Sequence, residues 1–291
     1  MELKKLKSED ISKLGLFEVL HILSLDVALG GLGGGILASK VLNVEPGFAF
    51  WIILPVAVWA LYNFDHLIDG TRLKENAHTI RHFYHYHYSK RILTIMGFLL
   101  LLMVPVIFVF LEKPIVLFGA IAGTITVAYF LVVYFFGNRK SFFVQKELSV
   151  ALIYTFGIWG GPASLMSWNF NSGQIILVIA FFICALTAVI LFSYCEEDTD
   201  RADHHTTLVA RFGKLWVKRI LYFLFPLLFA LSIYEVISAN QIIYARTAKL
   251  YMLMGILLLM IMSFSETLKQ NNRYRYLTEF VFWLPGLAFW L

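Results

Sequence analysis

The chain has 291 residues, of which 59% are hydrophobic and only 15% are charged, and its mean hydropathy is +0.74. Soluble domains carry about 25% charged residues, so this composition excludes an ordinary soluble protein. The net charge of +5 suits the anionic inner leaflet of a membrane. We therefore expect a lipid bilayer, and no nucleic acid, as the partner of the basic residues.

Apolar segments long enough to cross a bilayer recur along the whole sequence. A membrane-spanning helix needs about 20 apolar residues, and the long continuous runs seen here exclude the alternating strands of a membrane barrel. We predict an all-α polytopic membrane protein, one domain over residues 1–291, built as a bundle of about nine transmembrane helices around a central cavity. The predicted spans cover residues 16–39, 47–64, 92–111, 114–136, 148–168, 174–194, 217–237, 247–265 and 277–291.

The basic residues give the orientation of these spans. With a cytoplasmic N-terminus, 20 of the 24 Lys and Arg residues fall in cytoplasmic segments, as the positive-inside tendency requires. Residues 1–15 then form a charged cytoplasmic tail, which lacks the leading apolar region of a cleavable signal peptide. We predict a multi-pass protein of the plasma or inner cell membrane.

Acidic residues stand at the ends of two predicted spans. Asp65 and Asp69 follow the second span, and Glu196 and Asp200 follow the sixth, with Asp203 one turn further. Residues four apart share one face of a helix, and both ends lie on the same side of the membrane. The two acidic faces can close around hard divalent cations, which prefer carboxylate oxygen. The alternative is that these residues are solvated loop charges beside hydrophobic helices.

The two acidic motifs resemble those of the UbiA-type intramembrane prenyltransferases. Asp65 and Asp69 match the last two acids of the family pattern N-D-x-x-D-x-x-x-D. Residues 196–201 match the pattern D-x-x-x-D-R, with Glu196 in place of its first Asp. Leu61 and Tyr62 stand where the family has Asn and Asp, so the first motif has one carboxylate fewer.

Three further segments extend the resemblance over most of the chain. Residues 134–139 are similar to the family pattern Y-x-x-x-K-R, and residues 25–30 are similar to L-D-K-P-I-G. Residues 200–213 are similar to D-R-A-x-G-x-x-T-L-x-x-x-x-G, although His204 replaces the first Gly. Asn138 stands where the pattern Y-x-x-x-K-R has Lys.

The resemblance implies an enzyme that transfers a prenyl group from a polyprenyl diphosphate to an aromatic or other small acceptor, in lipid or quinone synthesis. It implies Mg²⁺ as the cofactor, which would neutralise the leaving diphosphate. The catalytic metal ligands implied are Asp65, Asp69, Glu196 and Asp200, with Asp203 as a further ligand. The diphosphate-binding residues implied are Arg81, Tyr134, Arg139, Lys140 and Arg201.

Asp26 lies inside the first predicted span, before the glycine-rich residues 30–35. A carboxylate within a membrane is costly and by default suggests function. The other interpretation is helix packing, with glycines that permit close approach and His21 as the partner of Asp26. The sequence favours neither.

Histidines support a rival hypothesis. His66, His78, His82, His85 and His87 follow the second span, and His204 and His205 follow the sixth. Residues 78–82 have the HxxxH form of membrane di-iron oxidoreductases, and imidazole clusters suit iron. That class carries additional HxxHH boxes, which this sequence lacks. A transporter or another non-catalytic relative with the same acidic cavity is a further alternative.

Overall fold

The computed structural model describes residues 8–136, 146–203 and 207–290, which form helices and turns and contain no strand. The predicted all-α class is confirmed. The long helices are α3 (Leu25–Leu42), α4 (Phe48–Leu73), α6 (Ser89–Phe110), α7 (Lys113–Phe136), α8 (Lys146–Leu165), α9 (Ser172–Cys195), α12 (Lys214–Ser238) and α13 (Ile242–Ser263). The shorter ones are α1 (Ser8–Ser12), α2 (Leu16–Ile22), η1 (Lys74–Asn76), α5 (Ile80–His87), α10 (Glu197–Ala202), α11 (Leu208–Phe212), α14 (Ser265–Leu268), η2 (Gln270–Asn272), α15 (Arg273–Val281) and η3 (Leu284–Trp290).

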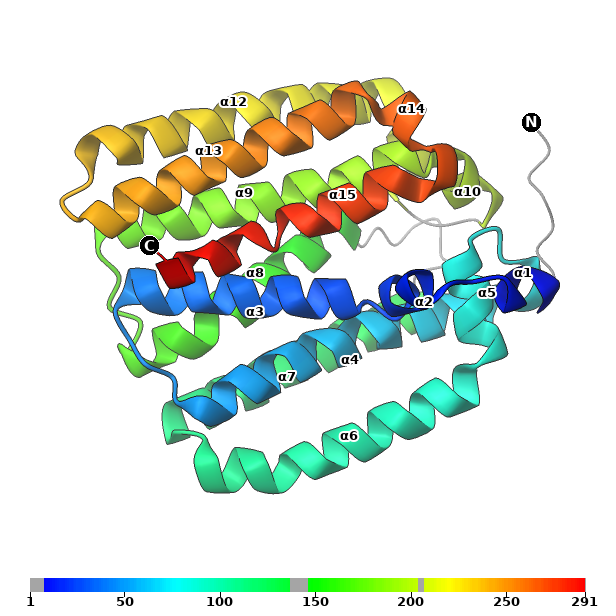
Figure 1. The fold of residues 1–291 in the computed structure, drawn as a ribbon, viewed down its shortest axis with the longest axis horizontal. Coiled ribbons are helices and arrows are strands. Elements are labelled where there is room, and N and C mark those ends of the chain that lie inside the picture. The colour runs from blue at the N-terminus through cyan, green and yellow to red at the C-terminus, as the bar shows by residue number, and fades with distance from the viewer. Residues whose placement is uncertain (1–7, 137–145, 204–206, 291) are drawn as a thin grey trace.

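The eight long helices are long and apolar enough to cross a membrane, and they run in roughly parallel or antiparallel directions in Figure 1. They correspond to the first eight predicted spans. The predicted ninth span, residues 277–291, is not confirmed within the described part of the chain, where α15 ends at Val281 and the short helix η3 follows. Pro285 has no N–H with which to continue the hydrogen bonding of α15.

Two helix boundaries differ from the predicted ones, and they change which residues belong to the helices. The first span is divided into α2 and α3 by Ser24, whose φ of 55° lies in the left-handed region. The second span extends past residue 64 to Leu73, so Asp65 and Asp69 are helical residues. Asn63 in this helix donates hydrogen bonds to the carbonyl oxygens of Leu23 and Trp59, at 2.8 Å each. It thereby ties α4 to the turn between α2 and α3.

The C-terminal segment runs back along α3 (Figure 1). A Cβ on Gly33 would lie 2.8 Å from the backbone nitrogen of Gly286, so only glycine permits this approach. The glycine-rich part of α3 therefore permits close packing of the C-terminal segment. Helix packing was one of the two interpretations of Asp26 and residues 30–35.

Helices α6 and α7 lie at the edge of the bundle. Only 11% of the apolar window of α6 and 17% of that of α7 are buried, because α6 packs mainly against α4 and α7 against α8. An apolar chamber of about 570 Å³ lies between these four helices.

Candidate functional site

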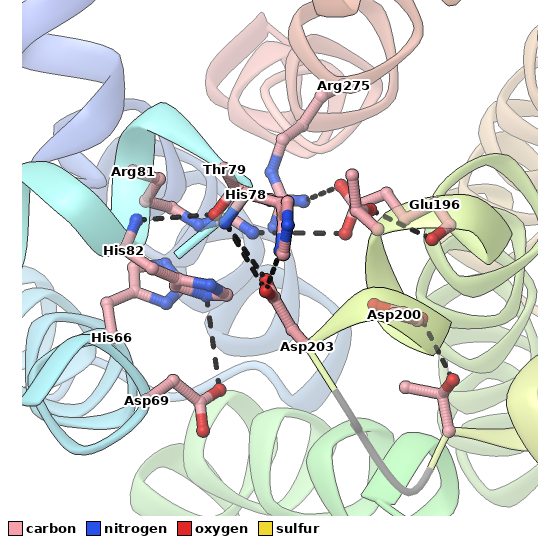
Figure 2. A network of polar contacts seen from close by, with 12 residues as sticks. His66, Asp69, His78, Thr79, Arg81, His82, Glu196, Asp200, Asp203 and Arg275 are labelled. Atoms are coloured by element: carbon pink, nitrogen blue, oxygen red, sulfur yellow. Dashed lines mark hydrogen bonds and ion pairs between the residues drawn. The ribbon is translucent and has the colours of Figure 1, made fainter. Parts of the chain in front are cut away.

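A polar cavity of about 120 Å³ lies at the end of the bundle where α4 meets α5 and α9 meets α10. Figure 2 shows polar side chains of its lining. Its lining combines residues that are far apart in the sequence. Among the described residues, the lining carboxylates are Asp65, Asp69, Glu147, Glu196 and Asp200, the permanent cations are Arg81, Lys146 and Arg275, and the imidazoles are His66 and His82. The two predicted acidic pairs thus face one cavity.

The α4 wall of the cavity is formed by Asp65 and Asp69, which lie on one face of the helix as their spacing predicts. Lys146, at the start of α8, places its Nζ 2.9 Å from Asp69 Oδ2 and 3.4 Å from Asp65 Oδ2. On the other side of Asp69, His82 Nε2 lies 4.0 Å from Oδ2. One ammonium group therefore serves two carboxylates.

The α9–α10 wall begins with Glu196, where α9 ends. Its Oε1 accepts hydrogen bonds from Arg275 Nη1 and, at 2.8 Å, from Tyr274 Oη. Arg81 Nη2 lies 3.9 Å from Oε2. Burial opposes ionisation of Glu196, but the guanidinium groups of Arg275 and Arg81 hold its pKa below the ordinary value. Glu196 is therefore a carboxylate with two cationic neighbours.

Asp200, one turn further, has a different environment. It is buried, and its Oδ2 accepts a 2.8 Å hydrogen bond from the neutral hydroxyl of Thr207. Burial, together with the nearby charge of Glu196, raises the pKa of Asp200 to about 8. In the metal-free protein this carboxyl therefore holds its proton at neutral pH.

Three other predicted site residues lie away from the described lining of the cavity. Asp203 Oδ1 lies 2.5 Å from His78 Nδ1 and accepts from the His78 backbone N–H at 3.3 Å (Figure 2). Arg201 pairs with Glu197 at 2.8 Å and is more than half exposed. Tyr134 is 67% exposed on α7. Their positions give no support to direct roles in the cavity.

Two of the predicted diphosphate-binding residues, Arg139 and Lys140, and the histidines His204 and His205 lie outside the described residues. Of the predicted cationic residues, Arg81 is the one described in the lining of the cavity.

Sequence reasoning missed Lys146, Glu147 and Arg275 as lining residues. Lys146 and Arg275 belong to the 20 basic residues of the predicted cytoplasmic segments, for which the sequence indicates only an orientation. All three stand at the ends of apolar segments on the same predicted side as the acidic motifs, and this was the available signal. The Oε1 of Glu147 accepts a 2.6 Å hydrogen bond from the Leu208 N–H, so this residue also anchors the start of α11.

The polar cavity and the apolar chamber adjoin each other. Tyr62, Asp65 and Val150 line both of them. A charged mouth is thus backed by a hydrophobic space whose volume falls within the range of ordinary ligand pockets, about 300–1,000 Å³.

The histidines of the rival hypothesis make specific contacts in the described structure. The His66 ring lies 5.2 Å from that of His85 and 6.0 Å from that of His82, between centroids. His85 has Nδ1 2.9 Å from the Arg81 carbonyl oxygen and Nε2 3.1 Å from Asn63 Oδ1. Both ring nitrogens of His85 therefore face protein acceptors, which fixes α5 against α4.

Comparisons of this chain with protein-family models, with curated proteins and with solved structures find no match. The resemblance to the UbiA-type enzymes therefore rests on the sequence motifs alone.

Proposed function

We propose that this protein is a membrane-embedded enzyme that transfers a prenyl group from a polyprenyl diphosphate to a small acceptor, with Mg²⁺ as cofactor. The observation that carries the proposal is the junction at Tyr62 and Asp65 of a charged cavity with a 570 Å³ apolar chamber. A polyprenyl diphosphate has the same two parts, a charged head and a hydrocarbon tail. We further propose that the long helices span a cell membrane with the cavity on the cytoplasmic side.

The charges of the cavity suit a diphosphate only when cations accompany it. Even with Asp200 protonated, the other four lining carboxylates outnumber the three permanent cations, so a bare diphosphate would be repelled. Magnesium is commonly held by one or two carboxylates plus substrate phosphates, without an all-protein cage. The facing pairs on α4 and α9–α10 fit that donor set, and Mg²⁺ held there would neutralise the leaving diphosphate.

The residues of the chain have separate parts in the proposed reaction. Arg81 and Lys146 are placed to donate charge-assisted hydrogen bonds to diphosphate oxygens. The allylic C–O bond breaks and its electron pair leaves with the diphosphate. A bond then forms from the prenyl carbon to the acceptor, which loses a proton to the solvent. The chamber lined by α4, α6, α7 and α8 excludes water from the cationic carbon, and the Tyr62 ring lies at the junction.

The test uses the purified full chain with labelled prenyl diphosphates of several chain lengths, with and without Mg²⁺. Release of diphosphate and formation of a labelled product are measured. We expect Asp65→Asn and Asp200→Asn to lose Mg²⁺-dependent turnover, by about 100-fold or more if each supplies transition-state charge stabilisation. Asp198→Asn is the matched control, because Asp198 is exposed on the same short helix as Asp200.

The same sample separates the alternatives. Binding of prenyl diphosphate without turnover would identify a non-catalytic or transport relative. Stoichiometric iron in the purified protein would favour the di-iron hypothesis. Full turnover in both Asn variants would contradict the assignment of Asp65 and Asp200 as Mg²⁺ ligands.

A further inference from the structure

Outside the polar cavity, three potential ligand residues converge near the turn between α2 and α3. They are His21 at the end of α2, Asp26 in the first turn of α3, and Glu279 in α15. One ligand atom from each lies within 4.8 Å of the other two, and among the described residues this is the one group of three or more His, Cys, Asp or Glu side chains to do so. The left-handed Ser24 makes the turn that brings His21 back to Asp26.

The two oxygens of each carboxylate have different partners. Asp26 Oδ1 accepts a 2.9 Å hydrogen bond from the Val27 N–H, and Glu279 Oε1 accepts a 3.2 Å bond from Arg275 Nε. The remaining oxygens, Asp26 Oδ2 and Glu279 Oε2, both contact His21 Nδ1, the second at 2.9 Å. Three donor atoms from three segments thus point to one place.

A single hydrogen on the imidazole nitrogen can make only one well-aligned hydrogen bond to these two oxygens. His21 Nδ1 bonds to Asp26, and Glu279 Oε2, on a side chain that is only 9% exposed, forms no hydrogen bond. A buried acceptor without a well-aligned donor is unfavourable. Arg275, the other cation at Glu279, is shared with Glu196. Glu279 therefore shares both of its cationic neighbours, His21 with Asp26 and Arg275 with Glu196.

The surrounding side chains hold these donors in place. Trp283 Nε1 donates a 2.8 Å hydrogen bond to the carbonyl oxygen of Asp26. The Tyr276 ring lies 3.9 Å from the His21 ring, between centroids. Such outer contacts orient the ligands of metal sites.

We propose that His21, Asp26 and Glu279 form a binding site for a first-row divalent transition metal ion, with Zn²⁺ as the best match. One imidazole nitrogen and two carboxylate oxygens are ligands that Zn²⁺ accepts, and three protein ligands leave a fourth position open. The site is separate from the carboxylates assigned to Mg²⁺. Arg275 connects the two regions, because it bonds to both Glu279 and Glu196.

The test measures Zn²⁺ binding to the purified full chain after removal of metals with a chelator. Stoichiometry is determined by elemental analysis and affinity by competition with a chromophoric chelator. We expect one tightly bound Zn²⁺ per chain, and binding at least about 100-fold weaker in Glu279→Gln and in His21→Gln, since loss of an outer-shell partner alone costs 10–100-fold. The Zn²⁺-induced rise in Tm should disappear in both variants.

Two controls keep the result specific. Glu266→Gln makes the same chemical change at an exposed carboxylate on α14, and it should bind Zn²⁺ as the wild type does. Asp200→Asn should also retain the ion, which separates this site from the Mg²⁺ site. Absence of tight Zn²⁺ binding to the wild type overturns the proposal, and so does full binding in Glu279→Gln and His21→Gln.

Discussion

The two acidic walls of the cavity have the same four-residue spacing but different counter-charges. On α4, Asp65 and Asp69 share the ammonium of Lys146. On α9–α10, Glu196 has two guanidinium neighbours, whereas Asp200 accepts a hydrogen bond from a hydroxyl and holds its proton to about pH 8. A motif spacing therefore predicts which side chains share a face, while the residues packed against that face decide which of them are charged.

The largest expected effect tests the α9–α10 wall. Arg275→Gln would leave Glu196 and Glu279 without their shared cation. Removing one partner from a buried ion pair costs about 3–5 kcal/mol, so the Tm of the purified protein should fall by several degrees. Arg273→Gln, at an exposed position on the same helix, should change stability by no more than about 0.5 kcal/mol. Equal Tm values for the two variants would contradict the assigned role of Arg275.

The next effect separates Asp200 from the ionised carboxylates. Its pKa is raised from 3.8 to about 8 in the folded protein, so the folded state binds a proton that the unfolded state releases above about pH 4. Stability should therefore fall as pH rises from about 4 to 8. At about 1.4 kcal/mol per pKa unit, the loss between pH 5 and 7 is at most about 3 kcal/mol.

The comparison is between Asp200→Asn and Asp198→Asn, with Tm measured against pH in the presence of a chelator. Asn cannot ionise, so Asp200→Asn should lose the decline that the wild type and Asp198→Asn show over this range. If the Tm of Asp200→Asn still falls over this pH range, the fall comes from the ionisation of another group.

The smallest effect concerns the α4 wall. Lys146→Met would leave two carboxylates facing each other. Because the Lys146 side chain is 25% exposed, solvent screening should limit the loss to about 2 kcal/mol, below that of a fully buried pair. Added Mg²⁺ should recover more stability in this variant than in the wild type, since it can replace the missing positive charge. Lys90→Met, at an exposed position in the first turn of α6, is the control. An equal response to Mg²⁺ in all three proteins would break the proposed distinction between the walls.

Local sequence pattern predicted the helices and the shared faces of the acidic pairs. Continuous apolar runs set the eight long helices, and the spacing of Asp65 and Asp69 was enough to place both on one cavity wall. The spacing of Asp203 extends the same pattern, but its carboxylate bonds to His78 and it is not among the described residues of the cavity lining. The sequence carries no local signal for that contact, which joins residues 125 positions apart.

Contacts between distant segments also explain the missed cations. Lys146 and Arg275 reach the cavity because α8 packs against α9, and α15 against α9 and α3. Such helix neighbours follow from the packing of the whole bundle, which apolar periodicity alone does not specify. The predicted ninth span is not confirmed in the described residues, where Pro285 and Gly286 lie in the short helix η3 after the end of α15.

The return of the C-terminal segment along α3 has a consequence for biogenesis. Arg275 and Glu279 belong to α15, which follows all eight long helices in the chain. During synthesis every long helix can therefore be made before Arg275 joins the cavity, and before Glu279 completes the proposed Zn²⁺ site. A truncation after α13 would keep all eight long helices but remove Arg275 and Glu279, so insertion of the helices can be tested separately from the contacts that these two residues make.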